Sequence, residues 1–70
     1  MEIIVNGQTK IVPEACSAQQ LVEIMEIGHG RIAMEVNREI VPRSTYGEFK
    51  FTPGDQVEIV HAVGGGQKNF

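Results

Sequence analysis

The residues most suggestive of chemistry are three consecutive glycines near the end of the chain, Gly64, Gly65 and Gly66. They directly follow residues 56–63, a run rich in β-branched side chains that predicts a strand. Because glycine lacks a side chain, this segment could enter a narrow protein channel from which any Cβ would be excluded. A loose glycine-rich terminus is the alternative. A phosphate-binding loop fits poorly, because such loops lead into a helix and no helix can follow here.

Other side chains with catalytic or metal-binding potential occur singly. Cys16, the only cysteine, precedes a predicted helix and could be a reactive thiolate, but a small buried side chain is the simpler interpretation. His29 and His61 lack the three or four convergent ligands that a zinc site needs. Glu23 and Glu26 lie about one helical turn apart, which is more typical of a solvated helix face than of a catalytic carboxylate pair. We therefore expect no catalytic residue and no metal site.

The composition indicates one small globular domain. A chain of 70 residues has room for one core, because it buries only ~60 % of its unfolded surface. The net charge is −3 and the basic residues are scattered, so nucleic acid is an unexpected partner. A single cysteine fits a reducing compartment, and neither a leader nor an apolar run of the ~20 residues that a membrane span needs is recognisable. We expect a soluble, cytoplasmic protein with no membrane contact.

Turn chemistry predicts a β-hairpin at the start of the chain. Asn6-Gly7 stands between the apolar runs 2–5 and 8–12 and suits the two positive-φ positions of a type I′ turn. Pro13 lacks the N–H that a sheet ladder requires, so it should close the second strand.

Capping residues and apolar periodicity predict one helix over 18–27. Ser17 and Gln20 have the spacing of a capping box. Gly28 is placed to adopt the left-handed conformation that ends many helices. The expected apolar face consists of Leu21, Val22, Ile24 and Met25.

The middle of the chain alternates between buried and exposed positions. Residues 31–37 have the period of a strand with one buried face, and residues 40–42 predict a short extended piece ended by proline. A turn or brief helical turn is expected over 44–48, with Tyr46 and Phe49 folding back over the core.

The last elements complete the expected fold class. Residues 51–55 contain a Pro-Gly-Asp turn that leads into the strand 56–63. The order hairpin, helix, strand, irregular crossing and strand predicts an α+β fold, a mixed sheet of four to five strands with one main helix packed across one face.

Three segments in this order closely resemble the ThiS family of sulfur carriers of thiamine biosynthesis and, more distantly, the MoaD family of molybdopterin biosynthesis. They are residues 36–43 (VNREIVPR), residues 53–59 (PGDQVEI) and the pair Gly65-Gly66. The resemblance spans residues 1–66. It implies the ubiquitin-like β-grasp fold, which agrees with the element order predicted from the residues.

The resemblance implies a carrier and not an enzyme. An adenylyltransferase of the ubiquitin-activating type would use ATP and Mg²⁺ to adenylate the carboxylate of the last glycine, so the carrier binds no cofactor itself. Sulfur would then replace the adenylate as a thiocarboxylate, which a thiazole synthase consumes. On this chain Gly66 would carry the sulfur, and Gly64 and Gly65 would form the tail.

A docking face is expected beside that tail. Glu58, Val60 and Ala62 alternate along the last predicted strand and should point away from the core. The resemblance suggests that Arg43 and Tyr46 join this face.

The chain departs from the family pattern at its end. We expect a β-grasp domain over 1–63, a glycine tail over 64–66 and an extension over 67–70, so Gly66 has an amide where a free carboxylate is needed. Three explanations are open: a processing protease removes a native extension, the extension is a cloning remnant, or the protein is not a carrier. Alternatives to thiamine biosynthesis are molybdopterin, cysteine or siderophore synthesis, and a β-grasp interaction module without covalent chemistry.

Overall fold

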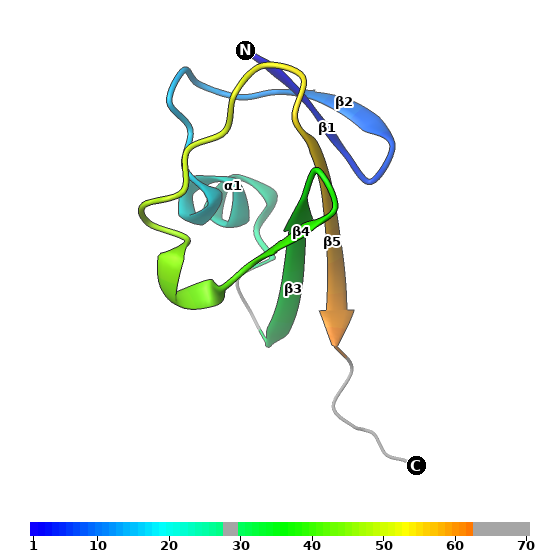
Figure 1. The fold of residues 1–70 in the computed structure, drawn as a ribbon, viewed down its shortest axis with the longest axis vertical. Helices are drawn as coiled ribbons and strands as arrows, with labels where there is room; N and C mark the ends of the chain where they lie inside the picture. The colour runs from blue at the N-terminus through cyan, green and yellow to red at the C-terminus, as the bar shows by residue number, and fades with distance from the viewer. Residues whose placement is uncertain (28–29, 63–70) are drawn as a thin grey trace.

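The computed structural model describes residues 1–27 and 30–62, which form a five-stranded sheet with one helix against one face (Figure 1). Strands β1 and β5 are parallel and the other neighbouring pairs are antiparallel. The strand order is β2-β1-β5-β3-β4, so the last strand lies in the middle of the sheet. The predicted mixed sheet and β-grasp architecture are confirmed. The elements are β1 (Glu2–Val5), β2 (Gln8–Ile11), α1 (Ala18–Met25), β3 (Arg31–Val36), β4 (Glu39–Val41), the 3-10 helix η1 (Arg43–Thr45) and β5 (Gln56–Ala62).

The first hairpin has the predicted turn. Asn6 and Gly7 have φ angles of 51° and 82°, and Val5 pairs with Gln8 across the turn. Strand β2 ends at Ile11, but the next residue, Val12, still donates its N–H to the carbonyl of Met1 at 2.9 Å.

The predicted capping box begins α1. Gln20 N–H donates to Ser17 Oγ at 3.1 Å, and Ser17 N–H donates to Gln20 Oε1 at 2.9 Å. Leu21 and Val22 are buried against the sheet, and each contributes roughly 1.5–3 kcal/mol to folding. The apolar face is narrower than predicted, because the Ile24 side chain is 44 % exposed.

The helix ends earlier than predicted. Its last residue is Met25, and Glu26 adopts the left-handed conformation (φ 57°) that was expected of Gly28, which lies outside the described residues. Glu26 N–H donates to the Glu23 carbonyl and Ile27 N–H to the Val22 carbonyl, both at 3.2 Å. These bonds satisfy carbonyls of the last turn and direct Ile27 back onto the core. The left-handed Glu26 thus ends the helix two residues before Gly28 and leaves Ile27 partly buried against the core.

The middle of the chain forms a second hairpin. Ile32, Met34 and Val36 are buried at alternate positions of β3, as predicted. The turn to β4 has two left-handed residues, Asn37 (φ 51°) and Arg38 (φ 72°). Arg38 therefore occupies a position that favours glycine, and this is why the turn escaped prediction.

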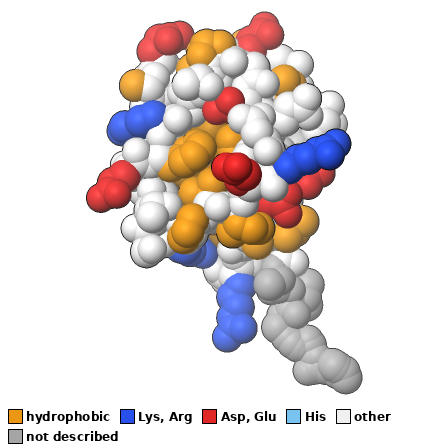
Figure 2. All heavy atoms as spheres, in the orientation of Figure 1, with side chains coloured by type: hydrophobic (Ala, Val, Ile, Leu, Met, Phe, Trp, Pro, Cys, Tyr) orange, Lys and Arg blue, Asp and Glu red, His pale blue; other side chains and the backbone are white. Residues whose placement is uncertain are grey.

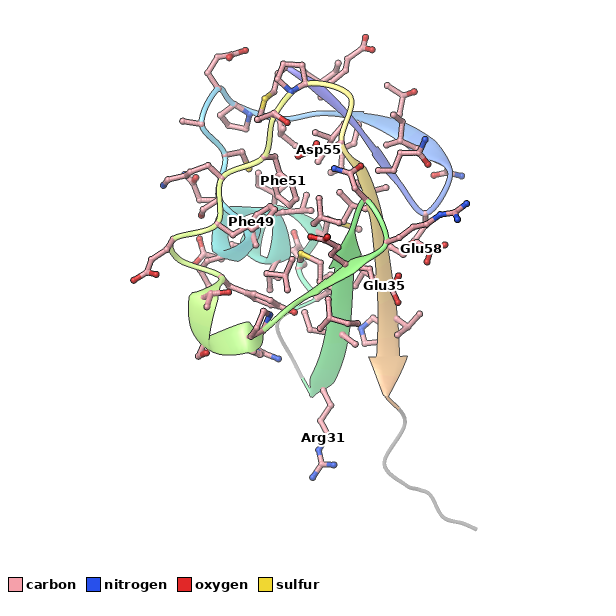
Figure 3. All side chains as sticks on the ribbon, in the orientation of Figure 1. Arg31, Glu35, Phe49, Phe51, Asp55 and Glu58 are labelled. Atoms are coloured by element: carbon pink, nitrogen blue, oxygen red, sulfur yellow. The ribbon has the colours of Figure 1, made fainter. Side chains whose placement is uncertain are left out.

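The segment between β4 and β5 covers one side of the core, as expected. Tyr46 is 2 % exposed, and Phe49 is partly buried against the same cluster. Phe49 and Phe51 meet edge to face with ring centroids 5.4 Å apart (Figure 3).

Two turn asparagines hold β5 in place. Asn6 Nδ2 donates to the Ile59 carbonyl at 3.2 Å, and Ile59 N–H donates to Asn6 Oδ1 at 2.9 Å. At the other flank, Gln56 N–H donates to Asn37 Oδ1 at 3.1 Å, while Asn37 N–H donates to the Gln56 carbonyl at 2.7 Å. The first residue of each hairpin turn thus binds the central strand.

Asp55 organises the turn before β5. Its carboxylate accepts hydrogen bonds from Thr52 N–H and Thr52 Oγ1, both at 2.9 Å, and from Asn37 Nδ2 at 3.0 Å. Burial acts to raise the pKa of Asp55, but the hydrogen bonds from Thr52 and Asn37 together bring that pKa below its usual value. The carboxylate form therefore stabilises the turn.

Replacing Asn6 with glycine tests the side-chain hydrogen bonds from Asn6 to β5 separately from the turn. Asn6→Gly retains the positive φ but removes both side-chain hydrogen bonds to Ile59, so we expect a loss of about 1–2 kcal/mol in the free energy of unfolding. Urea unfolding followed by circular dichroism measures it, with Gly47→Ala as the control because a Cβ at Gly47 meets nothing within 4 Å. An unchanged free energy of unfolding in Asn6→Gly would contradict a stabilising role for these two hydrogen bonds.

The pH dependence of stability in Asp55→Asn tests whether the ionised carboxylate of Asp55 stabilises the turn. A carboxyl group whose pKa is lowered on folding stabilises the protein above its unfolded pKa of ~3.9 and loses that contribution as the pH falls through the lower folded value. The stability advantage of the wild type over Asp55→Asn should therefore be constant near neutral pH and shrink below about pH 4. Urea midpoints between pH 7 and pH 2 check this. An advantage independent of pH would rule out the carboxylate as its source.

Candidate functional site

One face of the sheet is left open by α1. Val57 and Ile59 of β5 point into the core, whereas Glu58 and Val60 alternate with them and are exposed. Strand register places further side chains on the same side, since residues directly opposite one another share a face. We call this surface the open face. It comprises Ile4, Arg31, Ala33, Glu35, Ile40, Glu58 and Val60.

Cross-strand rows organise the open face. Ile40, Glu35 and Glu58 form a row across β4, β3 and β5. Ala33 and Val60 form the next row. Figure 3 shows Glu35 and Glu58 on the side of β5 away from α1. Glu58 and Val60 therefore lie exposed, as predicted for a docking face.

The open face leads to the end of β5. Arg31 pairs with Ala62 in the last row, so Ala62 lies on the predicted strand, although its side chain is outside the described part. Figure 3 shows Arg31 extending past this end of the sheet, and Figure 2 shows a basic side chain projecting there. On the visible side of the molecule, hydrophobic side chains gather near the middle and an acidic side chain lies among them (Figure 2). Residues 63–70, including Gly64, Gly65 and Gly66, lie outside the described residues.

Arg43 and Tyr46 behave differently from each other. Arg43 is exposed, donates to the Gly30 carbonyl at 3.4 Å, and lies 5.9 Å from the Tyr46 ring centroid. Its contact with Gly30, which precedes Arg31, places it near the end of the sheet where β5 finishes. The prediction that Tyr46 joins an exposed face is wrong, because its ring fills the core; burial raises its pKa despite the opposing effect of Arg43.

Sequence reasoning missed five residues of the open face, namely Ile4, Arg31, Ala33, Glu35 and Ile40. Glu35 lies opposite Glu58, Arg31 lies opposite Ala62, and Ile40 is 65 % exposed beside Glu35. The alternation of β3 indicated the face on which Arg31 and Glu35 lie, but only strand pairing shows which residues they meet.

The isolated reactive side chains do not form a second site. Cys16 is fully buried, and burial raises the pKa of its thiol despite the opposing charges of Lys50 and the N-terminus. Glu23 and Glu26 are exposed on or beside the helix, and His61 is exposed. Within residues 1–27 and 30–62, no three side chains of His, Cys, Asp or Glu are grouped to hold a metal ion. None of the helices in that part is long and apolar enough to cross a membrane.

Comparison with known proteins places this arrangement in a family. A crystal structure of the thiamine biosynthesis protein ThiS from Geobacter metallireducens superimposes with a TM-score of 0.81 at 26 % identity, covering 94 % of this chain and 100 % of that one. The sulfur carrier protein ThiS of Escherichia coli is 26 % identical over 66 residues, which is 94 % of this chain and 100 % of that protein.

A longer relative carries a similar segment. The thiazole synthase of Paramagnetospirillum magneticum is 32 % identical over 66 residues, which is 94 % of this chain but only 20 % of that protein. The model of the ThiS family matches residues 2–66, from the first strand to the third glycine of the tail. This coverage of the fold and tail shows that the chain belongs to the ThiS family.

Proposed function

We propose that this protein is a sulfur carrier of thiamine biosynthesis and that Gly66, once it is the last residue, carries the sulfur. The observation that carries the proposal is the family match, which extends through the whole β-grasp domain and stops at Gly66. The names of the relatives from Escherichia coli and Geobacter metallireducens support the same role. The chain is then a carrier and not an enzyme.

The proposed chemistry takes place on the tail. A Gly66 carboxylate oxygen attacks the α-phosphorus of ATP, pyrophosphate leaves, and an acyl-adenylate forms. Hydrosulfide then attacks the acyl carbon and AMP leaves, so that a thiocarboxylate remains. An adenylyltransferase of the ubiquitin-activating type supplies ATP, Mg²⁺ and the electrostatic stabilisation, because none of these steps needs a side chain of the carrier.

The carrier contributes a fixed starting point and a slim, extensible tail. The strand before the tail is fixed because β3 pairs with β5 as far as the Arg31–Ala62 pair, while on the other side β1 and the Asn6 side chain bond β5 as far as Ile59. Gly66 is four residues beyond Ala62, so its carboxylate can extend about 13–14 Å from the sheet. Because residues 64–66 have no Cβ atoms, the extended tail can enter a narrow channel of a partner enzyme.

Thiazole synthase is the proposed acceptor of the sulfur. A carrier-like segment within a protein named thiazole synthase supports this partnership, because joining two modules in one chain raises their effective concentration. The open face, with Glu58 and Val60 on its central strand and Ala62 at the end of that strand, is the proposed docking surface for the partner enzymes of the carrier. Arg43 lies at the edge of this surface.

The extension requires one further step. In residues 1–70 the Gly66 carbonyl belongs to an amide, which cannot be adenylated. We propose that a processing protease cuts after Gly66 and releases Gln67, Lys68, Asn69 and Phe70.

A comparison of two chain lengths tests the processing step. Residues 1–66 and 1–70 are incubated separately with ATP, Mg²⁺, a sulfide source and a ThiS-type activating enzyme, and intact masses are recorded. We expect the adenylate and then the thiocarboxylate on 1–66 alone, because only that chain ends in the required carboxylate. Modification of uncut 1–70 would contradict the proposed site, and no modification of 1–66 would contradict the proposed carrier role.

Substitution of the last glycine tests the need for a slim tail. In residues 1–66, Gly66→Ala should lower kcat/KM for adenylation at least tenfold, because the added Cβ obstructs the channel. The matched control, Gly47→Ala, adds the same methyl group where nothing lies within 4 Å and should react like the wild type. Pyrophosphate release measures both. Equal rates for Gly66→Ala and wild type would show that the enzyme does not confine the tail.

A further inference from the structure

Two carboxylates face each other at the centre of the open face. Glu35 and Glu58 are directly opposite on β3 and β5, which places their Cβ atoms ~4.5–5.5 Å apart on the same side of the sheet. Neither forms an ion pair within 4.0 Å in the part of the chain that the structure describes. Like charges directly opposite destabilise a sheet, so this pair is unfavourable in the free protein.

A hollow adjoins the pair. It has a volume of about 500 Å³ and opens beside the turn between β3 and β4. Arg38, a left-handed residue of that turn, also lines the hollow, yet it forms no ion pair with either carboxylate in the described residues. The hollow is lined by Ile4, Gly7, Glu35, Asn37, Arg38, Gln56, Val57 and Glu58.

Apolar side chains flank the carboxylates. Ile40, next to Glu35 in the same row, is 65 % exposed, and Val60, two residues along β5 from Glu58, is 59 % exposed. The surface therefore combines a negative centre with aliphatic neighbours. An arginine side chain has the complementary chemistry, because its guanidinium donates to two carboxylates while its methylene stem packs on apolar groups.

We propose that the hollow lined by Glu35 and Glu58 receives an arginine side chain of the activating enzyme, with Ile40 and Val60 packing against apolar side chains around it. This inference rests on the proposed function and specifies how that partner is recognised. The same strand that supplies Glu58 and Val60 continues into the tail, so a partner docked here is positioned to receive Gly66. A second copy of this face is a poor occupant, because two negative centres would meet across the interface.

Glutamine variants separate docking from folding. Glu35→Gln, Glu58→Gln and the double variant are made in residues 1–66, with Glu23→Gln on the opposite, helical side as the matched control. Relief of the repulsion should raise the melting temperature of the double variant by about 1–5 °C. The KM for adenylation should nevertheless rise at least tenfold at an unchanged kcat, because a charged pair in the interface is lost. Glu23→Gln should match the wild type in KM.

Salt dependence supplies a second signature. The wild-type KM should increase with NaCl concentration, and the double variant should show a weaker dependence because the paired charges are absent. An unchanged KM in the double variant, while wild-type 1–66 is adenylated normally, would overturn the docking proposal and leave the carrier function intact. Failure of wild-type 1–66 to be adenylated would instead contradict the carrier function and, with it, this inference.

Two further results would overturn the assignment. One is that Arg38→Gln lowers the melting temperature while Glu35→Gln does not raise it. Arg38 would then neutralise the carboxylates in the free protein, and they would not need an arginine from a partner. If the double variant weakens binding to thiazole synthase but not to the activating enzyme in calorimetric titrations, then the arginine belongs to the other partner.

Discussion

The central position of β5 is the constraint on which the remaining structure depends. Strand β5 is the last element described, yet it lies between β1 and β3 and receives hydrogen bonds from both hairpins. Asn6 binds Ile59, and Asn37 binds Gln56, so each turn side chain extends the pairing beyond its own strand. The strand that precedes the glycines is therefore supported on both sides, which suits an anchor for a segment that must reach into another protein.

This arrangement divides the sheet into two surfaces with different roles. One side meets α1 and the covering segment that contains Tyr46 and Phe49, and it holds the apolar core. The other side keeps carboxylates and aliphatic groups exposed around β5. Because successive residues of a strand point to opposite faces, β5 contributes to both surfaces without conflict. Folding and docking can then be altered by different substitutions in the same strand.

Local signals were sufficient for much of the fold. Asn6-Gly7 predicted the first hairpin, and Ser17 with Gln20 predicted the start of the helix, because a turn or a cap depends on neighbouring residues alone. The helix end was misplaced because the helix stops at a left-handed Glu26, a conformation for which glycine is the usual residue, and Ile27 then packs against the core. Arg38 in the second turn is a similar case, because it adopts a left-handed backbone conformation that glycine adopts at a lower energetic cost.

The candidate site was predicted only along a single strand. Alternation in β5 correctly predicted that Glu58 and Val60 are exposed. Their neighbours on β3 are more than twenty residues away in the sequence, so identifying them requires knowledge of the strand order. Glu35 and Arg31 could therefore not be paired with β5 from spacing. Tyr46 was misplaced because an aromatic residue in a turn can either cover the core or face solvent, and only packing decides between them.

The central claim concerns the chemical state of the chain end in the cell. Its most direct test is the intact mass and fragmentation of the protein isolated from its native cells under thiamine limitation. A carrier predicts a population that ends at Gly66 with sulfur in place of one carboxylate oxygen. A population consisting only of the uncut 70-residue chain, without sulfur, would contradict it.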